Sequence, residues 1–237
     1  MVTRRRRRVE RKPHGIPPRA RRFRRRLLAW YRRCGRDLPW RGATDPYRVL
    51  VSEVMLQQTQ VARVREFYPR FLARYPTLED LAAAPFDAVR ESWDGLGYYA
   101  RARNLHATAR HVARELGGVF PRRPEELGRL PGIGRYTAAA VASLAFGHDV
   151  ATVDTNVARV LGRVFRLRGA RGSAERMRRT WALAQALVPR GRSADWNQAL
   201  MDLGATVCTA RTPRCPACPV AAVCGSRRKG STARTVP

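Results

Sequence analysis

Hydrophobic residues recur at helical spacing along most of the chain, and proline or glycine separates one run from the next. Phe23, Leu27 and Trp30 begin the first pattern, which predicts a helix over about 23–33. Asp45 and Pro46 then supply an N-cap and a first-turn proline for an apolar helix. No segment alternates like a strand, so the sequence predicts an all-α protein. Further helices are expected at about 63–74, 78–83, 85–92, 98–116, 124–130, 135–146, 155–164, 173–188 and 193–204.

The composition narrows the class of protein. With 44% hydrophobic residues in 237, the chain can bury a core as one compact domain or two small lobes. The longest uncharged run, 136–148, is too short to cross a bilayer, so no membrane segment is expected. The first residues lack the apolar stretch of a secretory signal, although an Arg-rich organellar presequence stays an alternative. We expect a cytoplasmic, nucleoid-associated protein.

The charge indicates a polyanionic partner. Lys plus Arg number 47 against 18 Asp plus Glu, a formal net charge of +29, and only Lys12 and Lys229 are lysines. Guanidinium groups bind phosphate with two parallel hydrogen bonds. Residues 1–22 mix arginine runs with proline and are expected to form a disordered arm, and 227–237 a basic tail. A solvated arm that adheres to nucleic acid without a specific role is the plainer interpretation of 1–22.

Four cysteines lie within 17 residues near the end of the chain: Cys208, Cys215, Cys218 and Cys224. In a reducing compartment this spacing favours a metal site over a disulfide framework. Spacing alone does not choose between zinc and a cubane iron–sulfur cluster. The fifth cysteine, Cys34, stands alone and is expected to be a small buried hydrophobe.

Two glycines flank Ile133 between a short and a longer predicted helix. Gly132 and Gly134 permit a tight turn whose backbone N–H groups point outward at a helix N-terminus, where a DNA phosphate can bind. An ordinary turn between packed helices is the alternative.

Two carboxylates stand out from their surroundings. Glu53 lies in an apolar run, where burial would raise its pKa towards the range of a general acid. Asp154 lies at a predicted helix start, where the helix dipole favours an ionised carboxylate. A protonated and an ionised acid together can cleave a glycosidic bond. Alternatively, Asp154 is only an N-cap and Glu53 lies on the exposed side of its helix.

These features together resemble the MutY-type adenine DNA glycosylases of the helix-hairpin-helix superfamily, which also contains endonuclease III. The resemblance runs in order from about residue 24 to Cys224. It rests on Leu38-Pro-Trp-Arg41, Ser52-Glu-Val-Met-Leu-Gln-Gln-Thr-Gln60, Gly95-Leu-Gly-Tyr-Tyr-Ala-Arg-Ala-Arg-Asn-Leu-His106, the Gly132-Ile-Gly134 hairpin, Val153-Asp154 and the cysteine set.

The resemblance implies two helical lobes with double-stranded DNA across the cleft between them. A six-helix lobe with the hairpin would span 45–145, and an iron–sulfur lobe would combine 23–44 with 146–226. The four cysteines would hold a [4Fe–4S] cluster, and the hairpin a phosphate with the help of a monovalent cation. The expected protein is a monomer whose partner is DNA with a mismatch or oxidised base.

The resemblance also implies a base-excision mechanism in which the target nucleotide is flipped out of the duplex. Glu53 would protonate the purine at N7 and later handle the water, and Asp154 would stabilise the sugar cation or form a transient ester. Tyr136 and Asn156 fall where the family places groups that support Asp154. Related enzymes that also cut the strand have a lysine at the Tyr136 position, so a monofunctional glycosylase is expected.

Other residues map to DNA recognition by the same resemblance. Arg41, Leu56 and Gln198 fall in the adenine pocket. Arg211 and Arg214, between the first two cysteines, would contact the DNA backbone. The elements expected to probe or wedge the opposite strand contain Gln58, Thr59, Leu96 and Tyr98.

One departure leaves the base specificity open. Family members continue into a C-terminal domain that recognises 8-oxoguanine, whereas this sequence ends 13 residues after Cys224. Adenine opposite 8-oxoguanine or G is the expected target, and thymine in G·T mismatches is the alternative within the fold. A non-catalytic DNA-packaging protein and an electron-transfer protein are alternatives from other classes.

Overall fold

The computed structural model describes residues 17–170 and 172–227, which form helices and connecting loops with no strand among them. The helices lie close to the predicted ranges because proline, glycine and polar caps end most of the apolar runs. Their bounds are α1 Pro18–Cys34, α2 Pro46–Met55, α3 Val61–Arg74, α4 Leu78–Ala83, α5 Phe86–Ser92, α6 Ala100–Glu115, α7 Pro124–Leu127, α8 Arg135–Leu144, α9 Thr155–Phe165, α10 Ala174–Leu187 and α11 Ser193–Thr206, with 3₁₀ helices η1 Cys215–Ala217 and η2 Ala221–Val223.

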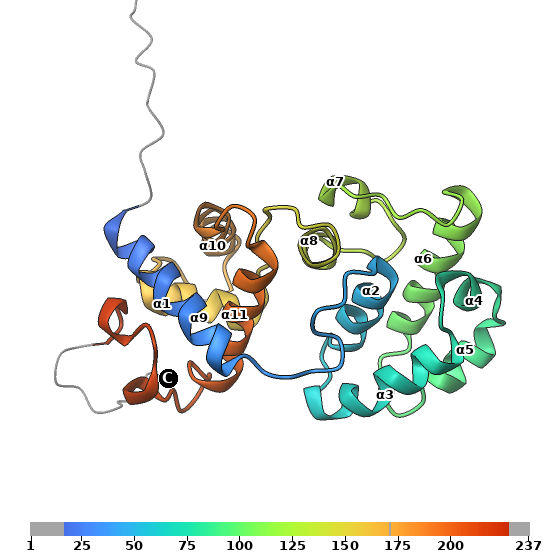
Figure 1. The fold of residues 1–237 in the computed structure, drawn as a ribbon, viewed down its shortest axis with the longest axis horizontal. Coiled ribbons are helices and arrows are strands. Elements are labelled where there is room, and N and C mark those ends of the chain that lie inside the picture. Colours follow the sequence, from blue (N-terminus) through green and yellow to red (C-terminus); the bar gives the residue numbers. More distant parts are fainter. Residues whose placement is uncertain (1–16, 171, 228–237) are drawn as a thin grey trace, which may run out of the picture.

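Two separate hydrophobic cores divide the described chain into two lobes that lie side by side (Figure 1). The hairpin lobe, α2 to α8, encloses the first core, with Trp93 and Leu81 fully buried. The hairpin lobe includes the four-residue α7, which directly precedes the hairpin and lies within the helix expected at 124–130. The cysteine lobe, which comprises α1, α9 to α11 and the loop 207–226, encloses the second core around Phe23 and Trp196.

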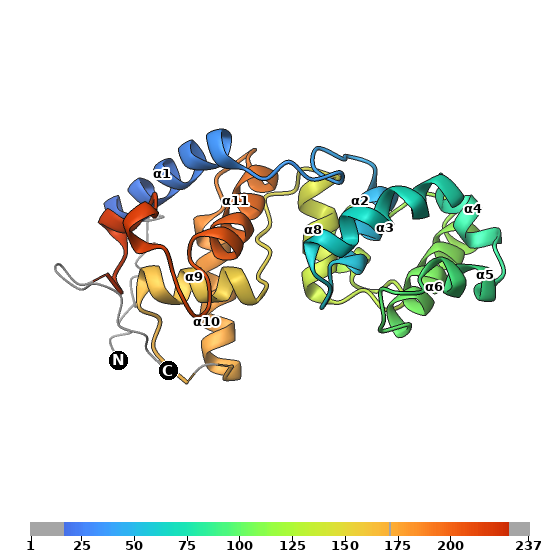
Figure 2. The same cartoon turned by 90° about the horizontal axis from the view of Figure 1, so that it is seen from below.

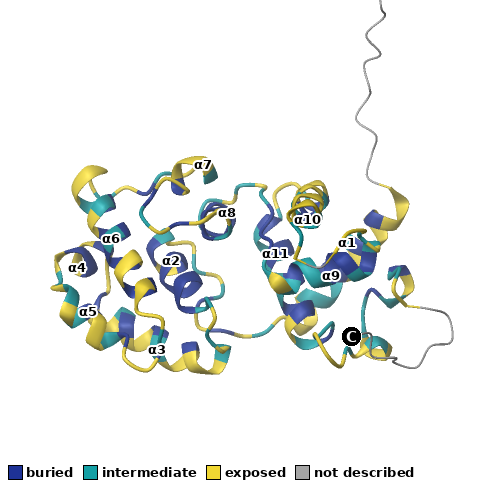
Figure 3. Cartoon of the chain, turned by 180° about the vertical axis from the view of Figure 1, so that it is seen from behind, coloured by how far each residue is buried: buried dark blue, intermediate teal, exposed yellow. Residues whose placement is uncertain are grey.

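Two segments connect the lobes, one after α1 and one after α8 (Figure 2). The predicted boundaries at 44/45 and 145/146 fall in these segments. Leu38 and Trp40, however, pack into the hairpin lobe although their segment was assigned to the other one. Side chains that face the two cores are buried, and those on the outer helix faces are exposed (Figure 3). No described helix is long and apolar enough to cross a membrane.

The prediction that structure begins near Phe23 is wrong by five residues, because α1 starts at Pro18. Arg19 explains the early start: its Nε donates to the Val223 carbonyl at 3.0 Å, and its Nη2 donates to the Val164 carbonyl. Ala20, within the predicted arm, is buried in the core. Residues 1–16 of the arm and 228–237 of the basic tail lie outside the described residues.

Candidate active site

A cleft of about 720 Å³ lies between the lobes and contains both predicted carboxylates. The hairpin lobe contributes α2 and α8 to its walls, and the cysteine lobe contributes α9, α11 and the connecting segment after α1. The cleft is therefore assembled from chain segments that are far apart in the sequence. Of the predicted site residues, it is lined by Arg41, Glu53, Leu56, Gln58, Thr59, Tyr136, Asp154, Asn156 and Gln198.

Glu53 is a buried carboxyl on α2, with only 6% of its surface exposed. Burial raises its pKa from 4.5 to about 7, a shift that the nearby Asp154 carboxylate reinforces. A hydrogen bond with Tyr136 and the charge of Arg41 oppose the rise. The shift has the direction that the apolar run around Glu53 predicts, and Glu53 does not lie on an exposed helix side. Near neutral pH this carboxyl can hold a proton and donate it.

Asp154 is the N-cap of α9, as one interpretation of its position predicted, and it also faces the cleft. Its Oδ1 accepts a hydrogen bond from the Val157 backbone N–H at 2.6 Å, and its Oδ2 accepts one from Asn156 Nδ2 at 3.1 Å. Both oxygens are thus held in place at the positive end of a helix. Asp154 therefore caps α9 and lines the cleft at the same time.

Asn156 is in turn connected to the cysteine loop through Arg159. Arg159 Nη2 donates to Asn156 Oδ1 at 2.6 Å, and its Nε donates to the Cys208 carbonyl at 2.9 Å. The same Nη2 reaches the Gly204 carbonyl at 2.9 Å. Two side chains therefore join the first cysteine of the loop to the Asp154 carboxylate. The sequence does not indicate this role of Arg159, because no motif distinguishes it from the many other arginines of the chain.

Tyr136 lies on α8 and lines the cleft. Burial raises its pKa well above the ordinary value, and the charges of Glu53 and Asp154 raise it further. Its Oη donates a long hydrogen bond to Met201 Sδ at 3.7 Å. The phenol therefore stays protonated near neutral pH.

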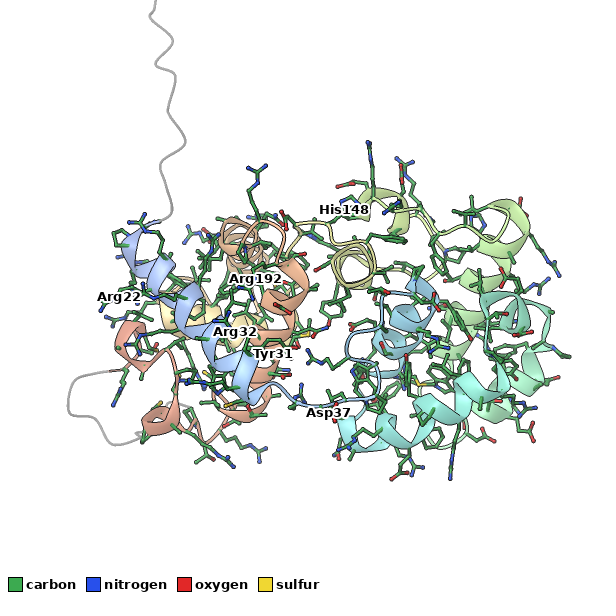
Figure 4. All side chains as sticks on the ribbon, in the orientation of Figure 1. Arg22, Tyr31, Arg32, Asp37, His148 and Arg192 are labelled. Atoms are coloured by element: carbon green, nitrogen blue, oxygen red, sulfur yellow. The ribbon has the colours of Figure 1, made fainter. Side chains whose placement is uncertain are left out.

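A second hydrogen-bond chain orders the far wall of the cleft. Arg41 Nη1 donates to Tyr31 Oη at 2.9 Å, and Tyr31 Oη donates to Gln198 Oε1 at 2.5 Å. Arginine cannot accept, so the tyrosine proton is free to point to Gln198, and the Gln198 NH₂ group stays available to the cleft. Figure 4 marks Tyr31 on α1, next to α11, which carries Gln198. The sequence reasoning missed Tyr31, which looked like an ordinary core residue.

Arg41 is also fixed by a buried carboxylate. Asp202, fully buried on α11, accepts from Arg41 Nη2 at 2.7 Å and from the Arg36 backbone N–H at 2.9 Å. The Arg36 side chain completes the site, with Nη2 2.7 Å from the same carboxylate. The sequence does not mark Asp202 as buried, because α11 also carries the acid Asp195 and the arginines that bind Asp202 lie far away in the chain.

The residues expected to probe the opposite strand divide into two groups. Gln58 and Tyr98 are exposed, with 63% of Tyr98 accessible, and Thr59 is half-buried at the cleft. Leu96 is only 6% exposed and packs in the hairpin-lobe core. Leu96 is therefore not placed to enter DNA in this conformation, because its loop turns it inward.

The hairpin between α7 and α8 depends on one of its two glycines. Gly132 has φ +71°, and a Cβ there would lie 2.4 Å from Asn104 Cβ. At Gly134, which is exposed, a Cβ would meet no atom within 4 Å. No side chain caps α8, so its first N–H groups are open to a ligand.

The four clustered cysteines are half-buried in a loop that contains η1 and η2, and Cys208, Cys218 and Cys224 pack against the second core. Burial raises the pKa of Cys218 to about 11, and the neighbouring thiols of Cys208, Cys224 and Cys215 raise it further. Arg163 Nη1 lies 3.4 Å from Cys208 Sγ. No three His, Cys, Asp or Glu side chains in 17–170 and 172–227 are placed to hold a metal ion.

Three remaining predicted positions lie on the surface. Arg211 and Arg214 are exposed on the cysteine loop. Cys34 is exposed at the end of α1, so its prediction as a buried hydrophobe is wrong. Cys34 lies in the last turn of α1, beyond the part of that helix, Ala20 to Leu28, that is buried in the second core.

The comparisons with protein families and with known proteins agree on one superfamily. A family model described as HhH-GPD superfamily base excision DNA repair protein matches residues 51–186. The adenine DNA glycosylase of Homo sapiens is 50% identical over 216 residues, which cover 87% of this chain and 40% of the human protein. That of Mycobacterium tuberculosis (strain ATCC 25618 / H37Rv) is 48% identical over 189 residues, 79% of this chain and 62% of the relative. The chain thus spans about half the length of these relatives.

Solved structures share the fold over nearly their whole length. A thermostable thymine-DNA glycosylase superposes with a TM-score of 0.80 at 34% identity, over 88% of this chain and 96% of that one. Endonuclease III in a non-covalent DNA complex superposes with a TM-score of 0.71 at 27% identity, over 87% and 95%. The chain belongs to the HhH-GPD superfamily of base excision DNA repair proteins.

Proposed function

We propose that this protein is a monofunctional DNA glycosylase that removes adenine mispaired with 8-oxoguanine or G. One observation carries the proposal: the cleft pairs a buried carboxyl of raised pKa, Glu53, with a carboxylate held by two hydrogen bonds, Asp154. The identity to adenine DNA glycosylases from several organisms supports adenine as the target base.

The cleft residues suggest how the bond is broken once the nucleotide is flipped out of the duplex. Protonated Glu53 gives its proton to N7 of the adenine, and the C1′–N9 bond breaks with its electron pair leaving on the base. Asp154 faces the resulting positive sugar and stabilises it electrostatically. Water then adds to C1′, and its proton passes to the Glu53 carboxylate, which restores the starting state. Tyr136 and Asn156 hold the two acids in position.

The pocket wall supports recognition of a purine. The Gln198 amide presents N–H donors to the cleft, and Arg41 is anchored beside it by Asp202. Leu56 supplies apolar contact. Donors at one end suit the ring-nitrogen acceptors of adenine, whose flat faces suit the apolar wall.

The proposal excludes efficient strand cutting. A lyase step needs an amine that forms a Schiff base, and the residue that hydrogen-bonds Glu53 in the cleft is the phenol Tyr136. Both lysines of the chain, Lys12 and Lys229, lie outside the described residues.

DNA would bind across both lobes. The open N-terminus of α8, beside Gly134, suits a backbone phosphate, with a monovalent cation at the hairpin between Gly132 and the DNA. Exposed Arg211 and Arg214 suit phosphates on the other lobe. Gln58, Thr59 and Tyr98 would contact the strand opposite the target.

The chemistry of the cysteine loop suits a [4Fe–4S] cluster, which Cys208, Cys215, Cys218 and Cys224 would hold once drawn around a common centre. Four half-buried thiols that perturb one another form a donor set of the right number and softness. The cluster would fix the loop, and thereby Arg211 and Arg214, on the protein surface. Arg159 and Arg163 already hold the start of the loop from α9.

Thymine removal from G·T mismatches is the second candidate, because the thymine-DNA glycosylase structure covers nearly the whole fold at 34% identity. A panel of duplexes containing A·8-oxoguanine, A·G, A·C, T·G and matched pairs, scored by strand cleavage after alkali, separates the two. We expect cleavage at adenine opposite 8-oxoguanine and G, and its near-complete loss in Glu53→Gln. Release of thymine alone, or unchanged turnover in Glu53→Gln, would contradict the proposal.

A further inference from the structure

One buried cation of the hairpin lobe is not used by the chemistry proposed above. Arg101, on α6, has only 8% of its surface exposed, and no carboxylate pairs with it in the part of the chain that the structure describes. An unpaired buried charge is costly unless other polar groups replace water around it. Backbone carbonyls from two loops do so here.

The first loop follows α2. Arg101 Nη1 donates to the carbonyls of Val54 at 3.0 Å, Met55 at 2.8 Å and Gln57 at 2.5 Å, and Nη2 donates to Thr59 Oγ1 at 3.0 Å. The first two carbonyls belong to the last turn of α2, at the negative end of the helix dipole, and the Val54 carbonyl also accepts from the Gln57 backbone N–H at 3.3 Å. The guanidinium thus caps the helix and holds residues 56–59 against it.

The second loop precedes α6. The same Nη2 donates to the carbonyls of Leu96 at 3.1 Å and Gly97 at 3.0 Å. Trp93 supports this arrangement, since its Nε1 also donates to the Gly97 carbonyl at 3.2 Å and its ring centroid lies 5.5 Å from Arg101 Cζ. One guanidinium therefore joins loop 56–59 to loop 95–98.

Both loops hold a non-glycine residue in the left-handed backbone region. Gln58 has φ +55° and Tyr98 has φ +49°, and Arg166 is the only other such residue in the described ranges. This conformation is unfavourable for residues with a Cβ, so surrounding contacts must maintain it. Each strained residue directly follows a carbonyl that Arg101 binds, Gln57 or Gly97. Arg101 also lies 5.7 Å from the exposed Tyr98 ring and supports one of its faces.

We propose that Arg101 is a positioning residue that fastens the two loops into one rigid element, which presents Gln58 and Tyr98 to the duplex beside the target base. The inference rests on the proposed function, in which these residues enter the DNA. If Arg101 joins the two loops, removal of its guanidinium should loosen both loops at the same time. Lysine cannot replace the arginine, because an ammonium lacks the planar fork that reaches both loops at once.

The first test uses the free protein and needs no activity. Hydrogen exchange is measured on peptides covering 56–60 and 95–99 in wild type, Arg101→Lys and Arg101→Met. The control is Arg110→Met, since Arg110 is an exposed arginine on the same helix. We expect exchange in both loops to rise at least about tenfold in the Arg101 variants and to stay unchanged in the control. A rise in one loop only, or in neither, overturns the proposal.

The second test separates positioning from general damage. Single-turnover base release is compared on two duplexes, one with adenine opposite 8-oxoguanine and one with adenine opposite an abasic site, where the base is already poorly held. Arg101→Lys should lose about 10- to 100-fold on the first duplex and only a few-fold on the second. Equal losses on both would mean that Arg101 is merely structural.

A milder variant keeps the test decisive if the Arg101 variants fold poorly. Thr59→Val removes one of the six hydrogen bonds and should give a smaller change of the same pattern in both loops. If wild type releases no base from any duplex, the proposed function fails, and the exchange measurement alone decides the role of Arg101.

Discussion

The two lobes differ in how far apart in the sequence their packed segments lie. The hairpin lobe is one nearly continuous stretch of chain whose helices pack through a large apolar core, with Trp93 and Leu81 at its centre. The cysteine lobe brings together the first helix and the last loop. There, arginines donate to carbonyls far along the chain: Arg19 to Val223, Arg24 to Leu187 and Arg163 to Thr209.

Arginines that bind backbone carbonyls occur in both lobes, and they change the interpretation of the net charge of +29. Several arginines are committed to internal carbonyls rather than to a polyanion, including Arg24, Arg101, Arg159 and Arg163. Exposed arginines such as Arg211 and Arg214 stay available for phosphate. A count of basic residues therefore overstates the charge that faces DNA.

The largest expected effect is on the cysteine lobe. Cys218→Ser removes one of the four proposed cluster ligands, and since bound metal contributes directly to folding, the lobe should lose its structure. Limited proteolysis should then cut within 146–226 and spare 46–144. Cys34→Ser is the matched control, because that thiol is exposed and outside the set. Equal resistance of the two variants would contradict the comparison.

The next effect concerns the hairpin lobe and its buried acid. Because the pKa of Glu53 is about 7 in the folded protein against 4.5 unfolded, the folded state binds the proton more tightly. The contribution of Glu53 to the free energy of unfolding therefore falls by about 3 kcal/mol as the pH rises from 4.5 to about 7. Glu53→Gln should lack this dependence, so the loss of unfolding free energy from pH 5 to pH 8, measured with denaturant, should be about 2.5 kcal/mol smaller in the variant than in wild type. Parallel pH curves would show that Glu53 is not buried as described.

A smaller effect is expected where the cysteine lobe supports the chemistry. Arg159→Gln breaks the connection from Cys208 to Asn156, so the Asp154 carboxylate loses part of its orientation. Base release should slow about 10- to 100-fold, while the binding of duplex changes little. Single-turnover kinetics measured beside a binding titration test this. A loss confined to binding would place Arg159 in DNA contact instead.

The smallest expected effect is on the free energy of unfolding and comes from the contact between α1 and the end of α10. Arg24 donates to three carbonyls at the end of α10, those of Ala186, Leu187 and Val188. Arg24→Met keeps the apolar stem and should cost about 1 kcal/mol in the free energy of unfolding. Arg25→Met is the control, because Arg25 is exposed on the same helix. Equal melting temperatures for both variants would show that these bonds add little.

The sequence predicted the helices well because their ends are marked locally. Asp45 and Asp154 both cap helices, and proline or glycine ends most apolar runs. It also predicted the buried environment of Glu53, because the residues on both sides of it are apolar and the helix is buried around most of its circumference. The early start of α1 was not predictable, because Arg19 finds its partners more than a hundred residues away.

The sequence was weakest on residues that act through long-range contacts. Tyr31, Asp202 and Arg159 organise the cleft, yet each of them reaches a partner beyond the range of any local pattern. The inward turn of Leu96 depends on the loop conformation that Arg101 maintains. In a chain with this many arginines, a buried one cannot be distinguished from a surface one by composition.

The pH dependence of base release tests most directly the claim that a protonated Glu53 acts as the acid. Single-turnover rates are measured from pH 5 to 9 on a duplex with adenine opposite 8-oxoguanine. We expect the rate of base release to fall as the pH rises, with an apparent pKa near 7 and a slope that approaches tenfold per pH unit above it. A rate that stays constant from pH 6 to 9 while depending on Glu53 would contradict it.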